Sequence, residues 1–382
     1  MAQWNRVPLI DYIELIGGGT PKTTVPEYWN GNIPWLSVKD FNNDKRYVYS
    51  TEKHISQSGF ENSPTKMLHK DDIIISARGT VGEIAMIPFD MAFNQSCYGI
   101  RASRGIDKPF LYYLLKNCIS QLKRMTHGSV FDTITRDTFA NIEVDIPDAE
   151  TQKRISSVLA DIDNKIEVND AINDNLQQQA ATLFKALFVD HAPFDGTMPP
   201  NWTISTLGDV TEMGAGGDKP KESSPVKTPL CPYPIYSNGI NDYGLYGYTN
   251  EPKIKVESVT VSARGTIGYV CLRHIPYVPI VRLVTLIPDT KVLSAKYLYL
   301  YLRQLHITGT GTTQQQLTVP DFRKTEIAIP DKNTMDAFTE TVTPLFEQIW
   351  ANEDENTKLA EVRDALLPKL MSGEIDVSAV QL

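Results

Sequence analysis

The chain has 382 residues, enough for two domains of ordinary size that each bury their own core. Hydrophobic residues make up 41% and charged residues 22%, which is typical of a soluble globular protein, and no run of about 18 apolar residues is present to span a membrane. No apolar signal core follows the amino-terminus, so we expect a cytoplasmic protein.

The net charge of −9 argues at first against a nucleic-acid partner, but the charge is unevenly distributed. Residues 1–147 have a net charge of 0 and residues 196–330 one of +3, whereas residues 148–195 and 331–382 carry −5 and −7. The acidity therefore lies in two particular segments, and the other two could bind DNA through a local patch. Neither is basic enough for charge alone to predict DNA binding.

In chain order, residues 1–147 contain apolar, β-branched runs such as 72–76 that are broken by Gly, Pro and Asn. These runs predict strands. A helix rich in Leu and Tyr is expected at 109–122, and an alternating strand at 142–146 ends before a proline. The segment is thus predicted to be a mixed α/β domain.

The same succession recurs in residues 196–330, which indicates an internal duplication. Ser76–Gly82 returns as Ser262–Gly268 with Ile in place of one Val, and Phe139–Pro147 is echoed by Phe322–Pro330. The second copy is expected to contain a strand, a helix and a last strand at 259–262, 294–305 and 326–329.

The segments 148–195 and 331–382 follow a helical pattern instead. In each, two sets of mostly apolar residues recur every seven residues, and the sets in the two segments match without a gap. The pattern predicts two helices of roughly 35–40 residues, packed as an antiparallel coiled coil with a pseudo-two-fold axis. Pro344 is expected to kink the second helix or limit its first turns.

Asparagines fall on the same two positions of both helices. Matching asparagine with asparagine places Asn169 near Asn356 and Asn173 near Asn352. In this register Ile162 is the only apolar residue that faces a polar one, Arg363. Buried polar pairs cost stability but fix the register of a coiled coil. The alternative is that all four asparagines are hydrated at a wet seam.

Several short motifs stand in a fixed order along the duplicated chain. They are Gly18–Pro21, Ile33–Asp40, Ser76–Gly82, Ile146–Ile155, Tyr233–Gly239 and Ser262–Gly268. In this order, around two long helices, the sequence resembles the specificity subunits of Type I restriction-modification systems over nearly its whole length. Met335-Asp336 departs from the family pattern and leaves the start of the second helix uncertain.

The resemblance implies an α+β fold with two similar target-recognition domains, 1–147 and 196–330, joined by conserved helical spacers, 148–195 and 331–382. Each domain would recognise one half of a bipartite site in double-stranded DNA, and the site would be asymmetric because the two domains differ. Two modification subunits with adenine-N6 methyltransferase activity and S-adenosylmethionine would bind this chain, and a restriction subunit would join them for cleavage. The chain itself would hold no cofactor.

The strongest candidates for DNA contact are Arg78 and Arg264, each placed after a predicted strand and before Gly-Thr. Arginine binds guanine or phosphate with two hydrogen bonds, whereas the alternative is a structural turn with an internal ion pair. The residues that we expect at the DNA are Thr20, Lys22, Lys39, Ser76, Arg78, Gly79, Thr80, Ser129, Lys219, Lys221, Ser237, Asn238, Ser262, Arg264, Gly265, Thr266, Thr313, Gln314 and Gln315. A polar surface loop is the alternative for those outside the two arginine motifs.

The residues give little support to a catalytic or metal site. Gly17-Gly18-Gly19 lacks the spacing of a nucleotide-binding loop. Asp148, Glu150 and Lys153 superficially suggest a nuclease, but they lie at a predicted helix start, where acidic residues favour the helix dipole. The histidines form no metal-binding pair, and the four cysteines, which lack CxxC spacing, are expected to be buried free thiols.

One other function stays open at this point. A protein-interaction scaffold of the same shape that does not recognise DNA would also account for the acidic total and the lack of a basic stripe.

Overall fold

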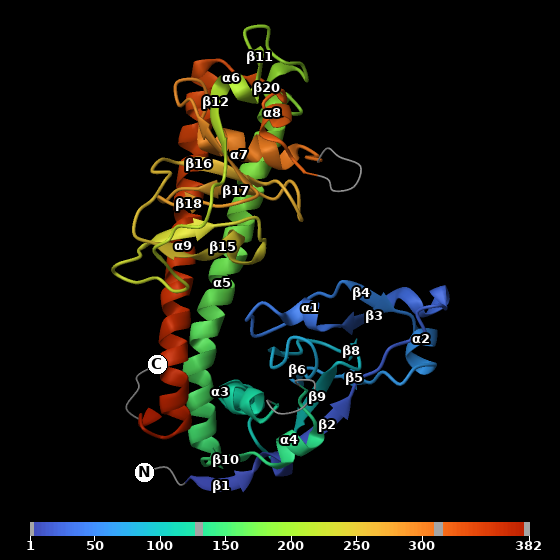
Figure 1. The fold of residues 1–382 in the computed structure, drawn as a ribbon. Helices are drawn as coiled ribbons and strands as arrows, with labels where there is room; N and C mark the ends of the chain where they lie inside the picture. Colours follow the sequence, from blue (N-terminus) through green and yellow to red (C-terminus); the bar gives the residue numbers. More distant parts are fainter. Residues whose placement is uncertain (1–3, 127–132, 309–315, 378–382) are drawn as a thin grey trace. The chain divides into compact units, whose positions relative to one another are not determined.

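The computed structural model describes the chain in three stretches, residues 4–126, 133–308 and 316–377 (Figure 1). It forms two compact units, which are residues 1–171 with 352–382 (unit 1) and residues 172–351 (unit 2). Two helices of 40 residues, α5 (Ala149–Phe188) and α9 (Lys332–Met371), each contribute one part to unit 1 and one part to unit 2. The lengths of both helices agree with the seven-residue pattern. No helix in the described part of the chain has the length and hydropathy needed to traverse a bilayer.

Unit 1 contains a small strand pair and two four-stranded sheets. The strand pair is β1 (Asn5–Pro8) with β10 (Glu143–Ile146); the first sheet has the order β2 (Ile13–Gly17), β9 (Cys97–Ala102), β6 (Ile73–Ser76), β7 (Ile84–Met86); the second has the order β4 (Lys53–Ile55), β3 (Trp29–Leu36), β8 (Met91–Phe93), β5 (Met67–Leu68). The helical segments are α1 (Val38–Phe41), α2 (Gln57–Glu61), α3 (Lys108–Thr126), α4 (Arg136–Ala140), η1 (Leu9–Tyr12) and η2 (Pro26–Tyr28).

Strand β6 has an apolar sequence because both of its faces are buried. Successive side chains of a strand point to opposite faces. Ile73 and Ile75 accordingly join the core that contains α3 and the ends of both long helices, while Ile74 joins a second core beneath the β3 sheet. Both faces of the strand are covered, so the alternation of an ordinary half-buried strand is absent.

Unit 2 has the same organisation. Its strand pair is β11 (Thr203–Thr206) with β20 (Glu326–Ile329); its first sheet has the order β12 (Thr211–Ala215), β19 (Leu283–Pro288), β16 (Ser258–Ser262), β17 (Val270–Arg273); its second has the order β13 (Ser223–Ser224), β15 (Leu245–Thr249), β14 (Tyr233–Tyr236), β18 (Val278–Pro279). The helical segments are α6 (Leu207–Val210), α7 (Ala295–Gln304), α8 (Val319–Phe322), η3 (Ala192–Phe194) and η4 (Asn241–Gly244).

The first sheets of the two units share one strand order, whereas in the second sheet the short strand β5 pairs with β8 in unit 1 and the short strand β13 pairs with β15 in unit 2. The order β2-β9-β6-β7 in unit 1 recurs as β12-β19-β16-β17 in unit 2, and one parallel pair lies in each second sheet, β3 with β8 and β14 with β18. The expected strands, the Leu- and Tyr-rich helices and the final strands all lie where the sequence placed them, within a few residues. The duplication seen in the sequence is therefore a duplication of α/β structure.

Both long helices begin with the same cap. Asp148 accepts hydrogen bonds from the main-chain N and the hydroxyl of Thr151, and Asp331 accepts the equivalent bonds from Thr334. The main-chain N–H of Thr151 lowers the pKa of Asp148, and the Thr334 hydroxyl does so for Asp331. The second helix thus starts at the position equivalent to the first, despite its different sequence there.

Pro344 does not limit the first turns of α9, because the helix begins at Lys332 and continues through it to Met371. The cysteine prediction is also confirmed in outline. All four cysteines are free thiols, and three are buried, while Cys231 is half-exposed.

The asparagine register is found within unit 1. Asn169 Nδ2 donates to Asn356 Oδ1 at 2.9 Å and to Glu355 Oε2 at 2.7 Å, and Asn356 Nδ2 donates to Asp170 Oδ1 at 2.9 Å. Asn169 is only 1% exposed, so the alternative of a wet seam does not hold there. The helices are antiparallel in this unit. The expected partnership of Asn173 with Asn352 joins residues of different units and stays a prediction.

Arg363 has a partner that the seven-residue pattern did not indicate. Its Nη1 donates to Oδ1 of Asp163 on α5 at 2.9 Å, and both side chains are almost completely buried. The expectation of an apolar partner for Arg363 is thus corrected, because a buried guanidinium requires an anion or acceptor.

Candidate nucleic-acid interface

The two arginine motifs form the same turn in the two units. The turn leaves the end of β6 or β16 and returns as β7 or β17. Its glycines are Gly79 and Gly82 in unit 1 and Gly265 and Gly268 in unit 2, and all four have left-handed backbone angles, with φ between 75° and 86°. Glycine adopts this conformation without a steric penalty, which explains why the motif retains two glycines at fixed spacing.

Main-chain hydrogen bonds close both turns in the same way. In unit 1, Gly82 N donates to Ser76 O at 3.0 Å, and in unit 2, Gly268 N donates to Ser262 O at 2.9 Å. Ser76 N donates to Glu83 O at 2.9 Å, as Ser262 N does to Tyr269 O at 3.0 Å. The recurring sequence therefore encodes a rigid loop that projects from the edge of the sheet.

The two serines of the motif stabilise this loop through hydrogen bonds of their buried side chains. Ser76 and Ser262 are fully buried. Ser76 Oγ donates to Thr80 O at 2.5 Å and accepts from Glu83 N at 2.8 Å, and Ser262 Oγ donates to Arg264 O at 3.3 Å. The expected DNA contact by these two hydroxyls is therefore corrected to a structural role, because both are buried and bound within their own loops.

The residues that follow the serines are accessible. Arg78, Gly79 and Thr80 are exposed, as are Gly265 and Thr266, and Arg264 is half-exposed. A methyl group added at Gly79 would meet no atom within 4 Å. The loop tips therefore offer guanidinium, hydroxyl and main-chain N–H groups, which are the donors that proteins use for DNA phosphates and guanine.

The described residues that come shortly after two other predicted segments are hydrogen-bonded to the arginine turns. Ile134 N donates to Ala77 O at 3.0 Å, and Leu317 N donates to Ala263 O at 2.9 Å. These bonds anchor the chain just after 127–132 and 309–315. Four of the expected contacts, Ser129, Thr313, Gln314 and Gln315, lie outside the described residues.

In unit 2 the structure joins two candidate segments that the sequence kept separate. Asn238 Nδ2 donates to Arg264 O at 2.8 Å, and Asn238 O accepts from Ser262 Oγ at 3.3 Å. Ser237 N donates to Gly244 O at 2.8 Å and closes the loop that follows β14. The Asn238 amide, which we expected at the DNA, is bound to the main chain in this structure.

The same loop carries aromatic and aliphatic residues that sequence reasoning missed. Ile240 and Tyr243 in the loop, and Tyr246 on the adjoining strand β15, are each about half exposed, at 49%, 51% and 52%. Asp242 and Tyr243 have left-handed φ angles of 47° and 54°, which are strained for residues other than glycine. The sequence signal that could have identified them is the occurrence of Tyr and Ile among Asn and Gly residues, which are typical of a turn.

The buried side chain of Arg273 stabilises this loop by a hydrogen bond to its main chain. Its Nη2 donates to Tyr243 O at 2.7 Å, its Nε donates to Thr260 Oγ1 at 2.9 Å, and its guanidinium lies 3.6 Å from the ring centre of Tyr236. Arg273 is only 5% exposed, so its guanidinium stabilises the loop and is not accessible to a ligand.

The remaining candidates are scattered over the surface loops. Lys22, Lys39 and Lys221 are exposed, and Lys219 Nζ lies 5.2 Å from the ring centre of Tyr246. Thr20 is half-exposed and its hydroxyl is bound to Gln95. Of these residues, the structure brings only Lys219 to the side of the Asn238–Tyr246 loop.

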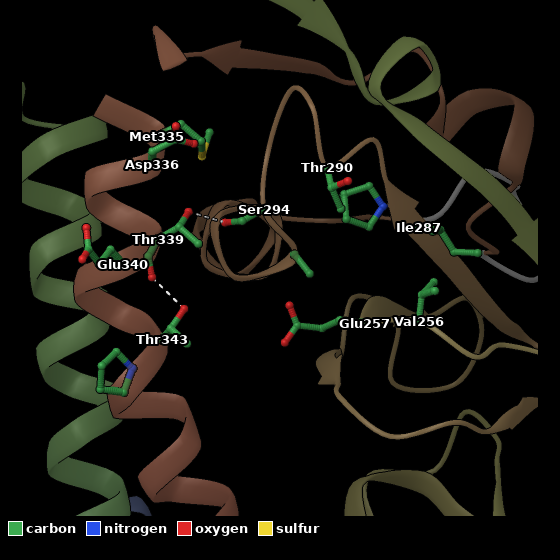
Figure 2. A pocket seen from close by; sticks show the side chains of 13 residues that line it. Val256, Glu257, Ile287, Thr290, Ser294, Met335, Asp336, Thr339, Glu340 and Thr343 are labelled. Carbon is green, nitrogen blue, oxygen red and sulfur yellow. Dashed lines mark hydrogen bonds between the residues drawn. The ribbon is translucent and has the colours of Figure 1, made fainter. Parts of the chain in front are cut away.

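A cavity of about 770 Å³ lies in unit 2 beside the first turns of α9 (Figure 2). Glu257, Asp336 and Glu340 are among its lining residues, which makes it unsuited to a phosphate. Within the described stretches, no three His, Cys, Asp or Glu side chains are grouped as a metal ion would require.

Two α/β units whose first sheets share one strand order, each presenting the same arginine turn, define a duplicated recognition protein. A family model described as the Type I restriction modification DNA specificity domain matches residues 1–178 and again residues 199–361. The chain therefore belongs to the family of Type I restriction-modification specificity subunits.

Relatives and a solved structure agree with this assignment. The chain is 28% identical over 415 residues to the Type I restriction enzyme MjaIX specificity subunit of Methanocaldococcus jannaschii, covering 98% of this chain and 94% of that one. It is 26% identical over 354 residues to the HindI specificity subunit of Haemophilus influenzae, covering 70% and 77%. The crystal structure of the Type I S subunit from M. genitalium has the same fold, with a TM-score of 0.58, 16% identity and coverage of 97% and 96%.

Proposed function

We propose that this chain selects the DNA sequence on which a Type I modification and restriction complex acts. Residues 1–147 and 196–330 are the two target-recognition domains, and each recognises one half of a bipartite site. The two domains differ in sequence, so the site is asymmetric. The helical segments 148–195 and 331–382 form the spacer between the domains.

The observation that carries this proposal is the repeated arginine turn. Arg78 and Arg264 follow equivalent strands, and their loops are closed by equivalent main-chain hydrogen bonds. A bidentate arginine discriminates guanine in the major groove or grips a phosphate, and adjacent Gly-Thr groups add phosphate contacts. Two such loops on one chain fit two half-sites.

The spacer is proposed to be an antiparallel coiled coil. A helix of 40 residues is about 60 Å long at about 1.5 Å per residue. Major-groove sites on one face of DNA recur about every 34 Å, so recognition domains held by such helices can contact separate turns of the duplex. A pseudo-two-fold relation of the domains would match the two-fold symmetry of the DNA backbone.

The chemistry is proposed to belong to partner subunits. Two modification subunits would bind this chain, supply S-adenosylmethionine and methylate adenine N6, and a restriction subunit would add cleavage. Relatives of this chain are named as specificity subunits, which supports a non-catalytic role for it. The proposal includes a cytoplasmic location, where such a complex meets chromosomal DNA.

Methylation mapping tests the proposal. The chain is expressed with its modification subunit, and N6-methyladenine is located across the host genome by single-molecule sequencing. We expect one bipartite, asymmetric motif with a fixed gap, and we expect one half of the motif to change when 1–147 or 196–330 is replaced. A formed complex without any methylated motif would refute the proposal and leave the scaffold that does not recognise DNA.

A further inference from the structure

One hydrogen bond between the α/β portion and the helix pair occurs at equivalent positions in both units. Ser156 on α5 donates to Asp107 Oδ1 at 3.0 Å, at the start of α3. Thr339 on α9 donates to Ser294 Oγ at 2.9 Å, at the start of α7 (Figure 2). Ser156 and Thr339 are equivalent under the shift that carries Asn169 to Asn352. Both domains therefore meet their helices through one common geometry.

About two turns further along α5, unit 1 has an ionic network centred on the buried side chains of Asp163 and Arg363. Tyr113 Oη on α3 donates to Asp163 Oδ2 at 2.6 Å, and Arg363 Nη1 donates to Asp163 Oδ1 at 2.9 Å. Arg363 Nη2 donates to Asp44 Oδ2 at 2.9 Å, and Lys116 Nζ donates to Asp44 Oδ1 at 2.8 Å. Asp163 and Arg363 are 4% and 3% exposed. Four elements of unit 1 thus depend on each other for charge compensation.

A second arginine extends the network along α5. Arg46, which is 9% exposed, donates to Ala160 O at 3.4 Å and to the side chain of Asn164. Its Nε lies 3.5 Å from Glu167 Oε1. The loop that contains Asp44 and Arg46 is therefore fixed to both helices by polar contacts.

Unit 2 has apolar residues at the equivalent positions. The shift that carries Asn169 to Asn352 pairs Asp163 with Phe346, Glu167 with Trp350 and Arg363 with Ala180. The register that aligns Tyr112 with Tyr299 pairs Tyr113 with Leu300. Tyr299 packs edge-on against Phe346 with ring centres 5.8 Å apart, and His274 stacks on Trp350 at 4.0 Å. Phe346, Ala180 and Leu300 are buried in one cluster.

We propose that these two sets of side chains assign each recognition domain to its own half of the helix pair. Asp163, Glu167 and Arg363 accept the first domain, and Phe346, Trp350 and Ala180 accept the second. The second domain placed on the ionic half would present Leu300 where Asp163 accepts a hydrogen bond from the Tyr113 hydroxyl. It would also remove Asp44, which binds Arg363 together with Asp163 and Asp364. Buried charges that lose their partners destabilise a fold strongly, so the wrong pairing is disfavoured.

A domain exchange combined with a helix exchange tests this. In a full-length chimera, residues 196–330 replace residues 1–147, so that the second domain occupies both halves. Three substitutions, Asp163→Phe, Glu167→Trp and Arg363→Ala, give the first half of the helix pair the residues of the other half. The same three substitutions are made in the natural chain, and thermal unfolding is measured for all four proteins.

The proposal requires a change of sign. The substitutions lower the unfolding midpoint of the natural chain by roughly 5 °C or more and raise that of the chimera by a similar amount. A control pair, Glu150→Asn with Lys153→Asp, copies exposed residues of the other half and shifts neither protein. The proposal would be overturned if the substitutions shifted the unfolding midpoint in the same direction in both chains. It would also be overturned if the chimera failed to fold both with and without the three substitutions.

A milder variant covers the case in which the triple substitution unfolds the natural chain. Tyr113→Phe removes only the hydroxyl that bonds Asp163, and burial together with Asp163 raises the pKa of Tyr113, so the hydroxyl stays protonated. Tyr113→Phe should lower the midpoint of the natural chain by several degrees but leave an Asp163→Ala chain, which has no acceptor for the hydroxyl, nearly unchanged. Equal effects in both backgrounds would contradict the proposal. None of these measurements involves DNA, so their outcome is independent of the proposed function.

Discussion

The side-chain amide of Asn238 donates a hydrogen bond to the main-chain oxygen of Arg264 at 2.8 Å. This bond ties the loop after β14 to the arginine turn after β16. The sequence presents the two segments as separate candidates, and the structure makes them one surface. Asn238 therefore acts on the position of Arg264, a role different from the direct DNA contact that we expected.

Asn238→Ala should weaken DNA binding by the assembled complex. The loss of one hydrogen bond of about 1 kcal/mol would reduce affinity by roughly fivefold, because the Arg264 turn would no longer be held. Affinity is measured with an oligonucleotide that contains the mapped motif. Asn250→Ala, which removes an exposed amide bound to Glu222, is the control and should leave affinity unchanged. Equal loss in both variants would argue against the positioning role.

Arg78→Ala and Arg264→Ala should each reduce affinity for the cognate site by about tenfold to 100-fold. A base-reading arginine also fixes its position in the motif, so its loss should relax the methylated sequence at one base. The loss of a phosphate-binding arginine should instead weaken binding to all sequences equally and reduce the slope of log affinity against log salt concentration by about one. Arg6→Ala, which removes an exposed partner of Glu143, serves as the control. Unchanged affinity in both test variants would remove the arginine turns from the interface.

Gly79→Ala should destabilise unit 1 by about 1–2 kcal/mol even though the site has room for a methyl group. The penalty comes from the left-handed φ of 79°, which alanine adopts poorly. Gly79→Asn should be tolerated better, since asparagine visits this region more readily. Chemical denaturation measures both variants. Alanine and asparagine variants of equal stability would show that backbone strain is not the cause.

The caps of the two long helices should make stability depend on acid. The folded pKa values of Asp148 and Asp331 lie below the ordinary value of 3.8, so the capping contribution is present above that pH and is lost as pH falls through the folded pKa. We expect constant stability from pH 5 to 8 from these groups. Asp148→Asn with Asp331→Asn should flatten the acid limb while keeping the caps at neutral pH, whereas two alanines should lower the unfolding midpoint at pH 7. An acid limb that is the same in the asparagine variant would exclude the caps as its cause.

The Asn169–Asn356 pair should show strong coupling. Asn169→Ala leaves Asn356 with a lost partner in a largely buried seam and should cost about 1–3 kcal/mol. Replacing both residues by leucine should cost less than the sum of the two single changes, because no buried amide then lacks a partner. A double-mutant cycle in urea gives the coupling energy. Additive effects would contradict the importance of the pair for the register.

Much of this structure follows from local sequence. The seven-residue repeats of 148–195 and 331–382 predicted both long helices, because one buried stripe requires helical spacing. Ser76–Gly82 and its copy predicted a repeated turn, since two glycines at fixed spacing are needed for left-handed angles. The match of Asn169 to Asn356 also followed from the pattern, because a buried amide needs another polar group opposite it.

Contacts between residues far apart in the chain followed no such pattern. Asp163 and Arg363 belong to different helices, Asp44 belongs to a surface loop, and no spacing connects them. The inward positions of Ser76 and Ser262 and the link from Asn238 to Arg264 likewise depend on which strands pair. The sequence by itself determined the duplication, the helices, the repeated turn and the family. Only the tertiary structure decided which polar groups are buried together, because burial and charge compensation arise where separate elements meet.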